Sequence, residues 1–201
     1  MHFTLCDLVT DITQNAVESG ADLVELDIRE TEKEFRFTVR DNGKGMDQDE
    51  IERAKDPFIT DGIKHPHRKV GLGIPFLIQT VLQSGGGWDL QSQKNRGTTI
   101  CAWFDMSNVD TPPVGELPGM FRTVLLFAGP ADILVRRSRE HSSTEYGVRN
   151  VHYEVCKSEL LNVLGDLEDA GSLILMDQYL RSLEEDDAEA DESRKDGEDE
   201  E

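Results

Sequence analysis

Residues 34–46 read EFRFTVRDNGKGM, and this stretch decides how the rest of the chain is interpreted. Every second side chain in its first half is apolar: Phe35, Phe37 and Val39. This alternation predicts a half-buried strand. Asp41 is next in the apolar series, so the strand would carry its carboxylate to the core side, where an unpaired charge is costly. Gly43 and Gly45 follow and leave backbone that a ligand can approach closely. We therefore expect a bound ligand to donate a hydrogen bond to Asp41.

Length and composition limit the class of protein. The chain has 201 residues, of which 37% are hydrophobic, enough for one sizeable core. No run of about 18 apolar residues is present, and the first residues lack the basic and apolar blocks of a signal peptide. We expect a cytoplasmic protein without a membrane segment. The three cysteines have no CxxC spacing, so neither a disulfide framework nor a zinc site is indicated.

The acidic residues are concentrated at the C-terminal end. The formal net charge is -20, and residues 184–201 contain twelve Asp or Glu against Arg194 and Lys195, a net charge of -10. This composition is typical of a disordered acidic tail. The remaining negative charge argues against nucleic-acid binding, which needs Lys and Arg gathered on one face.

The segment before this stretch predicts a helix and a strand. Apolar residues recur at helical spacing from Leu5 to Val17, and Gly20 closes the helix. Asp11 and Asn15 are four residues apart at the margin of the apolar stripe, so they either face a pocket beside the core or lie at a solvated edge. Residues 24–28 alternate as a second strand.

The segment after it predicts a short helix, a long loop and a helix followed by a hairpin. Residues 47–54 begin with a capping-box pattern, and residues 56–70 show no period and carry a basic group. Gly71 and Gly73 precede a helix over residues 74–82, which indicates either an anion site or a steric requirement. Strands over residues 88–93 and 98–104 complete a layer of helices over a mixed sheet.

Five short motifs in this region resemble, in order and spacing, the sequence boxes of the GHKL ATPase superfamily, which comprises DNA gyrase B-type, Hsp90, histidine kinase and MutL proteins. The five motifs are Asn15, residues 41–45 (DNGKG), residues 56–60 (DPFIT), residues 71–74 (GLGI) and residues 97–99 (GTT). The resemblance covers about residues 3–106 and is strongest to the histidine kinase branch. It implies an α+β fold, the two-layer Bergerat-type ATP-binding sandwich with helices on one face of a mixed sheet.

The resemblance also implies ATP and magnesium as ligands. Asp41 would accept a hydrogen bond from the adenine amine, Thr98 would hold a water shared with that carboxylate, and Asn15 would bind the magnesium ion. Backbone amides at Gly71 and Gly73 would meet the phosphates. The implied nucleotide-binding residues are Asn15, Asp41, Gly43, Gly45, Met46, Lys64, Lys69, Gly71, Leu72, Gly73 and Thr98.

Two departures from the family pattern bear on activity. Asp11 stands where relatives that hydrolyse ATP have a glutamate general base, and it is one methylene shorter, which matters because a general base must reach its proton donor. Only fourteen residues precede Asn15, so we expect the phosphoacceptor to belong to an unidentified partner protein.

These features leave three hypotheses in order. The first is a stand-alone protein kinase acting on His, Ser or Thr of the partner. The second is a non-catalytic ATP sensor. The third is an ATP-gated module that forms a homodimer.

The C-terminal part is predicted to be a small α+β extension. Residues 107–118 read as a linker, residues 119–183 as the extension, and residues 184–201 as the tail. Within the extension we expect a hairpin of strands 121–127 and 133–137, a strand over 148–155, a helix from a Ser158 cap to residue 167, and a helix over 172–183. The first domain ends at residue 106.

Overall fold

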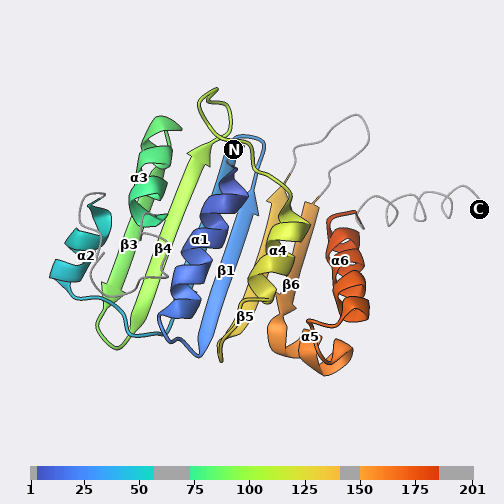
Figure 1. Cartoon of the computed structure of the whole chain (residues 1–201). Helices are drawn as coiled ribbons and strands as arrows, with labels where there is room; N and C mark the ends of the chain where they lie inside the picture. The colour runs from blue at the N-terminus through green and yellow to red at the C-terminus, as the bar shows by residue number, and fades with distance from the viewer. Residues whose placement is uncertain (1–3, 57–72, 141–149, 186–201) are drawn as a thin grey trace, which may run out of the picture.

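The computed structural model describes residues 4–56, 73–140 and 150–185, which form a six-stranded sheet with helices packed on one face (Figure 1). The strands are β1 (Leu23–Glu30), β2 (Glu34–Asp41), β3 (Gly87–Gln93), β4 (Gly97–Asp105), β5 (Asp132–Glu140) and β6 (Asn150–Cys156). The helices are α1 (Leu5–Glu18), α2 (Gln48–Lys55), α3 (Gly73–Gln83), α4 (Leu117–Leu125), α5 (Lys157–Leu164) and α6 (Ala170–Glu185). The expected α+β class is confirmed.

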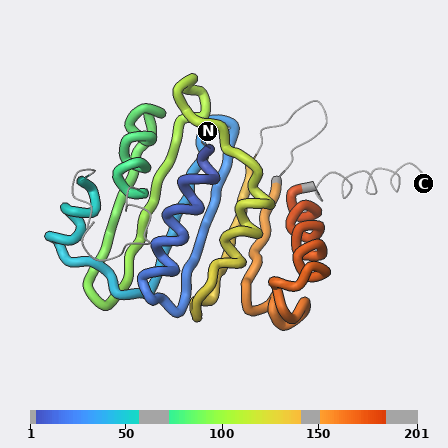
Figure 2. The backbone as a smooth tube through the Cα atoms, viewed as in Figure 1, coloured from blue at the N-terminus to red at the C-terminus, as the bar shows by residue number. Residues whose placement is uncertain are grey.

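The core lies between the sheet and its helices. Helices α3, α1, α4 and α6 lie side by side across the same face of the sheet (Figure 2). The alternation that predicted β2 is present in the fold, because Phe35 and Phe37 are fully buried and both rings lie near Phe104 of β4, at centroid distances of 6.4 and 6.3 Å. Thr4 and Asp7 form a capping box that starts α1.

The strand order is β3-β4-β2-β1-β5-β6, so the C-terminal extension continues the sheet of the N-terminal part. Strand β1 pairs antiparallel with β2 on one side and parallel with β5 on the other. The expected linker is tied to α1, since the backbone N–H groups of Leu5 and Cys6 each donate to carbonyls of Pro113 and Val114 at 2.9 Å. The sheet therefore runs without a break from the first part of the chain to the second.

One expected strand is wrong. Residues 121–127 were predicted to form a strand in a hairpin with residues 133–137, but residues 117–125 form helix α4, and β5 pairs with β1 instead. The Glu116 side chain accepts from the backbone of Gly119 at 2.8 Å, and Pro118 lies in the first turn, where its missing N–H costs nothing. The buried residues of α4 have helical spacing: Leu117, Met120, Phe121, Val124 and Leu125.

The limits of α5 also differ from the prediction. Ser158 is not the cap, because the helix begins at Lys157 after Cys156, and the backbone N–H of Ser158 donates to Asp132 Oδ1 at 3.0 Å. The helix ends at Leu164 rather than at residue 167. The strand predicted over residues 148–155 is present as β6, and the helix predicted over residues 172–183 is present as α6.

A buried arginine joins α6 to the sheet. The side chain of Arg137, in β5, is 0% exposed and forms ion pairs with Glu30 of β1 and Glu184 of α6. The hydroxyl of Tyr153 donates to Glu184 Oε1 at 2.7 Å, and burial together with this carboxylate raises the pKa of Tyr153. A buried guanidinium is tolerated only when it is paired in this way.

Among the described residues, no helix is both long enough and apolar enough to cross a membrane.

Candidate functional site

Asp41 lies at the end of β2, between Val24 of β1 and Thr98 of β4. The residue is 7% exposed, in agreement with its place in the apolar series. Its Oδ1 atom accepts two hydrogen bonds, from Ser19 Oγ at 3.1 Å and from the backbone N–H of Gly43 at 2.8 Å. Within the described part of the chain, Oδ2 has no hydrogen-bond partner. The carboxylate is thus held by one oxygen and keeps the other available.

Asp41 lines a cavity of about 220 Å³ on the helix-covered side of the sheet. Its walls come from α1, the end of β2 and the loop after it, β4, and the first residues of α3. They are formed by Ile12, Asn15, Ala16, Ser19, Val39, Asp41, Lys44, Gly45, Met46, Ala54, Ile74, Thr98 and Ile100. The cavity is mostly apolar with a few polar groups, as ligand pockets are.

The two glycines after Asp41 are required by contacts within the protein, and the close approach of a ligand to them stays a prediction. A Cβ on Gly43 would lie 1.9 Å from Ser19 Oγ, and a Cβ on Gly45 would lie 1.9 Å from the carbonyl oxygen of Gln93. Gly45 also has φ +56°, a conformation that glycine adopts without strain. Gly45 lines the cavity but Gly43 does not. Both glycines are needed by close contacts within the protein that hold this loop.

Helix α1 places Asn15 at the cavity and Asp11 one turn before it. Both side chains are exposed, and only Asn15 lines the cavity. Gly73, the first residue of α3, lies against them, because a Cβ there would be 3.1 Å from Asn15 Nδ2 and 3.9 Å from the Cβ of Asp11. The N-terminus of α3, the positive end of its dipole, is therefore next to Asn15.

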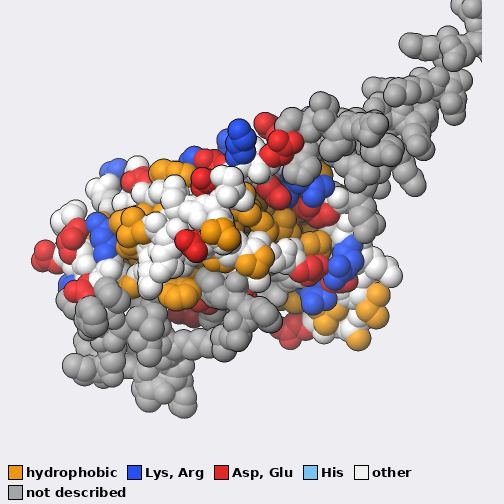
Figure 3. Space-filling view, turned by 90° about the horizontal axis from the view of Figure 1, so that it is seen from above, with side chains coloured by type: hydrophobic (Ala, Val, Ile, Leu, Met, Phe, Trp, Pro, Cys, Tyr) orange, Lys and Arg blue, Asp and Glu red, His pale blue; other side chains and the backbone are white. Residues whose placement is uncertain are grey.

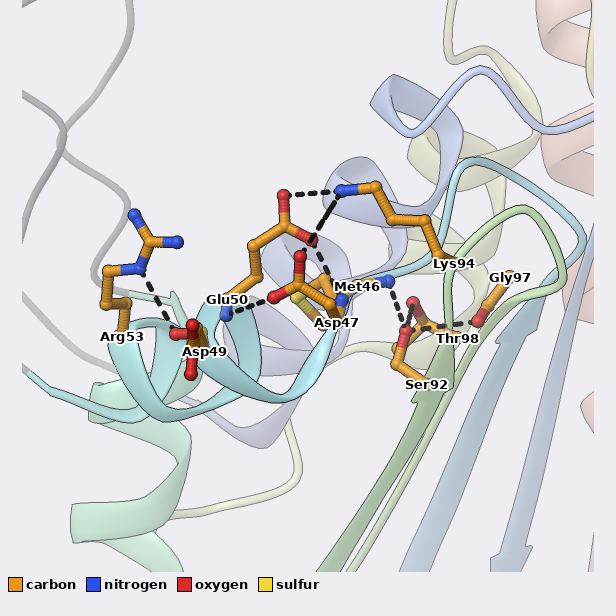
Figure 4. Close-up of polar contacts among 9 residues, drawn as sticks. All are labelled: Met46, Asp47, Asp49, Glu50, Arg53, Ser92, Lys94, Gly97 and Thr98. Atoms are coloured by element: carbon orange, nitrogen blue, oxygen red, sulfur yellow. Dashed lines mark hydrogen bonds and ion pairs between the residues drawn. The ribbon is translucent and has the colours of Figure 1, made fainter.

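Ser92 of β3 links the loop after β2 to the β3–β4 hairpin (Figure 4). Its Oγ accepts from the backbone N–H of Met46 at 2.8 Å, lies 2.9 Å from Thr98 Oγ1, and donates to the carbonyl of Gly97 at 3.1 Å. Because Ser92 has a single hydroxyl proton and donates it to Gly97, the hydroxyl of Thr98 must donate to Ser92 Oγ. The lone pairs of Thr98 Oγ1 are then available to the cavity. This network fixes both Met46 and Thr98.

An ion pair joins the β3–β4 turn to the start of α2. The Nζ atom of Lys94, in the β3–β4 turn, lies 2.6 Å from both carboxylate oxygens of Glu50 (Figure 4). Glu50 also forms a capping box with Asp47 at the start of α2. The hydrogen bond from Lys94, followed by that from the Asp47 backbone, lowers the pKa of Glu50. The start of α2 is thus attached to the hairpin that carries Thr98.

The model of the histidine kinase-, DNA gyrase B-, and HSP90-like ATPase family matches residues 3–108, more than half of the chain. The chain belongs to this family. Its membership supports an ATP-binding module, and it agrees with the resemblance carried by the five sequence motifs. No curated protein matches the chain.

The structure brings together five of the predicted nucleotide-binding residues around one cavity: Asn15, Asp41, Gly45, Met46 and Thr98. Gly73 lies next to Asn15 outside the cavity wall. The predicted residues Lys64, Lys69, Gly71 and Leu72 lie outside the described residues, and their roles stay predictions.

Sequence reasoning missed three residues of the site. Ser19 and Ser92 fix the site, and Lys44 lines the cavity without having been predicted as a binding residue. Ser92 could have been found, because it faces Thr98 in the register of the expected hairpin. Ser19 gave no signal, because nothing in its spacing to residue 41 shows that the end of α1 reaches the end of β2.

Proposed function

We propose that this member of the ATPase family is a protein kinase module that binds ATP with magnesium and transfers the γ-phosphoryl group to a His, Ser or Thr side chain of a partner protein. The observation that carries the nucleotide assignment is the Asp41 carboxylate. Two donors hold its Oδ1, and its Oδ2 is free at an apolar cavity. We further propose that the module acts in the cytoplasm.

The cavity suits an adenine base. The Asp41 carboxylate is largely buried and its Oδ2 opens to the cavity, and the exocyclic amine of adenine would supply a donor to it at the edge of a flat apolar ring. Ile12, Ile74 and Ile100 provide apolar walls on which such a ring can pack. Pockets that enclose whole drug-sized ligands measure about 300–1,000 Å³. The 220 Å³ cavity therefore suits the base, with the phosphates outside it.

The residues beside the cavity suit a metal-bound phosphate chain. Asn15 offers a neutral oxygen at the cavity wall, and magnesium takes oxygen ligands while keeping several waters. The N-terminus of α3 at Gly73 favours negative charge close to Asn15. When bound, magnesium would neutralise phosphate charge there. Phosphoryl transfer needs mainly such positioning and charge stabilisation, so a partner's side chain can serve as the nucleophile.

The adenine assignment is tested by calorimetric titration of the full chain with ATP and with inosine triphosphate, which carries an oxygen in place of the amine. The wild-type protein should bind ATP more tightly, because the inosine oxygen would face Oδ2 of Asp41. The Asp41→Asn variant should lose ATP affinity and also lose the preference, because an amide can donate to that oxygen. Asp89→Asn is the matched control, since Asp89 is exposed on β3.

Two results would reject the adenine assignment. One is equal affinity of the wild-type protein for the two nucleotides. The other is an unchanged preference in Asp41→Asn while the variant remains folded. Asn15→Ala tests the metal role, and it should weaken binding with magnesium present and leave the metal-free affinity nearly unchanged.

A second candidate function is a non-catalytic ATP sensor, and the identity of residue 11 favours it. The side chain of Asp11 is one methylene shorter than that of a glutamate, which shortens its reach as a general base. The two functions are separated by incubating the chain with ATPγS and a cell lysate and following thiophosphate on other proteins. A kinase transfers label in the wild type and not in Asp41→Asn, whereas a sensor gives the same pattern in both.

Hydrolysis gives a separate measurement of Asp11. Asp11→Glu should raise the rate of phosphate release if this position faces the attacking water. An unchanged rate would show that Asp11 has no role as a base, which is compatible with transfer to histidine because imidazole is itself the nucleophile.

A further inference from the structure

Helices α5 and α6 carry a group of exposed apolar side chains at the end of the molecule away from the cavity (Figure 3, lower right). Their exposed fractions are 42% for Leu161, 81% for Val163, 60% for Ile174, 54% for Leu175 and 44% for Tyr179. Single exposed apolar residues are ordinary on a protein surface. Five large ones on two consecutive helices make this end of the molecule a candidate interaction surface.

The geometry of α6 shows where this surface points. Met176 and Leu180 are fully buried against the core. Asp177, about 100° around the helix from Met176, binds Arg122 of α4 at 2.8 Å. Leu175 lies about 100° in the opposite direction, and Tyr179 is one turn further on the same side. The side of α6 that carries Leu175 and Tyr179 therefore faces away from α4.

This side lies at the last strand of the described sheet. Strand β6 pairs only with β5 among the described strands, and α6 packs on it. No described element lies beyond β6 to cover Leu175 and Tyr179 (Figure 1). We call Leu175, Tyr179 and the neighbouring Ile174 the α6 apolar stripe.

The two helices that carry the stripe have an excess of acidic residues. Residues 157–185 contain seven Asp or Glu and two basic residues, Lys157 and Arg181, and two of the seven, Asp177 and Glu184, are paired with arginines. Arg181 is already paired with Asp177 and Glu116, at 2.8 and 2.9 Å. The connection between α5 and α6 carries three exposed carboxylates that form no ion pair with described residues: Asp166, Glu168 and Asp169. The tail that follows adds a large negative charge.

These charges select among the occupants of the stripe. A second copy would bring the same acidic surface and another acidic tail close to the first, and like charges across an interface are costly. The tail itself cannot cover the stripe, because its only apolar residues between 186 and 201 are Ala188 and Ala190. An anionic lipid surface would be repelled in the same way.

We infer that the α6 apolar stripe docks a basic amphipathic helix of a partner protein. The apolar side of that helix would cover Leu175 and Tyr179, and its Lys or Arg residues would face the carboxylates of the α5–α6 connection. This inference goes beyond the proposed activity, because the nucleotide cavity lies at β2 and β4, whereas the stripe lies beside β6, with β1 and β5 between them (Figure 1).

The test uses the full chain and a dye-labelled Leu/Lys peptide of about 18 residues, long enough to form a helix when bound. Fluorescence anisotropy compares it with a scrambled peptide of the same composition that has no apolar side. The wild-type chain should bind the amphipathic peptide saturably and more tightly than the scrambled one. Leu175→Gln combined with Tyr179→Gln should weaken this binding about tenfold or more.

Leu82→Gln is the matched control, because Leu82 is 69% exposed on α3 at the other end of the molecule, and this variant should bind as the wild type does. ATP affinity measured on the same samples reports whether each variant is folded. If the wild-type chain binds the peptide but does not bind ATP, the proposed function is rejected and this inference still stands.

Three results would overturn the inference. Equal binding of the two peptides, or no effect of the double variant, would show a nonspecific charge attraction. A dimer seen by sedimentation equilibrium that the double variant abolishes would assign the stripe to a second copy. Sedimentation with anionic vesicles that depends on Leu175 and Tyr179 would assign it to a membrane surface.

Discussion

Replacing Ser19 by alanine tests whether the orientation of Asp41 controls nucleotide affinity. The Ser19 hydroxyl is one of two donors to Oδ1 of Asp41, and its 3.1 Å contact is longer than the 2.8 Å contact from Gly43. A hydrogen bond to a charged group contributes about 1.5–3 kcal/mol. Ser19 is half-buried and makes the longer contact, so we expect a loss near the lower limit.

Binding and folding should each be weakened. With only the Gly43 donor left, the carboxylate can rotate, and Oδ2 no longer points steadily toward the cavity. We expect the Kd for ATP to rise about five- to tenfold, equivalent to about 1–1.4 kcal/mol. The free energy of unfolding should fall by about 1 kcal/mol. Calorimetric titration and urea denaturation measure the two quantities on the same protein.

Ser172→Ala is the matched control. The hydroxyl of Ser172 also makes one hydrogen bond, to the carbonyl of Leu164 at 3.0 Å, but at the far end of the molecule. It should lower stability by a similar amount and leave the Kd for ATP unchanged. An unchanged Kd in Ser19→Ala, or an equal rise in Ser172→Ala, would refute the reasoning.

Three further substitutions or measurements follow from features outside that hydrogen bond. Arg137→Met should lower the free energy of unfolding by about 3 kcal/mol or more, because two partly buried carboxylates lose their shared partner; a loss below about 1 kcal/mol in urea denaturation would contradict this. Gly45→Ala should destabilise the fold and weaken ATP binding together, because φ is +56° and the added Cβ would meet the carbonyl oxygen of Gln93; a wild-type melting temperature would count against it. Burial raises the pKa of Cys6 from 9.0 to about 12, so the folded chain keeps this proton where the unfolded chain loses it. The contribution to stability is complete below pH 9 and falls between pH 9 and 12, and iodoacetamide at pH 8 should label Cys6 only after unfolding.

The N-terminal part of the fold could be predicted because its signals are local. The strand alternation of β2, the stripe of α1 and the glycine that ends it each depend on a few neighbouring residues. Asp41 was placed correctly at the buried end of its strand by alternation alone. Local periodicity determines which side of a strand or helix is buried, and these elements show it clearly.

The errors in the C-terminal part have two physical causes. Residues 117–125 contain the helical spacing of Leu117, Met120, Phe121 and Val124, but the aromatic and β-branched residues around Phe121 also favour a strand. The Glu116 cap and Pro118 are the local features that favour the helix. The parallel pairing of β5 with β1 could not be derived at all, because it joins residues more than a hundred positions apart and no local pattern encodes it.

The functional contacts at the cavity show the same limit. The motif predicted that Asp41 and Thr98 belong to one site, and β2 and β4 place them opposite each other. The sequence did not show that Gly43 and Gly45 also make room for other parts of the protein. Such close approaches are set by tertiary packing, which the sequence does not display.

The central position of β1 has a consequence for synthesis of the chain on the ribosome. Strand β1 ends at Glu30, yet β5, its partner on one side, begins only at Asp132. At about 5–20 residues per second, the ribosome needs roughly 5–20 s to make the intervening segment. During this time the chain can pair β1 with β2 and assemble the strands that line the nucleotide cavity, while the other edge of β1 still offers free N–H and C=O groups. Exposed strand edges of this kind are where newly made chains associate wrongly, so the nascent protein is most vulnerable in the seconds before β5 emerges.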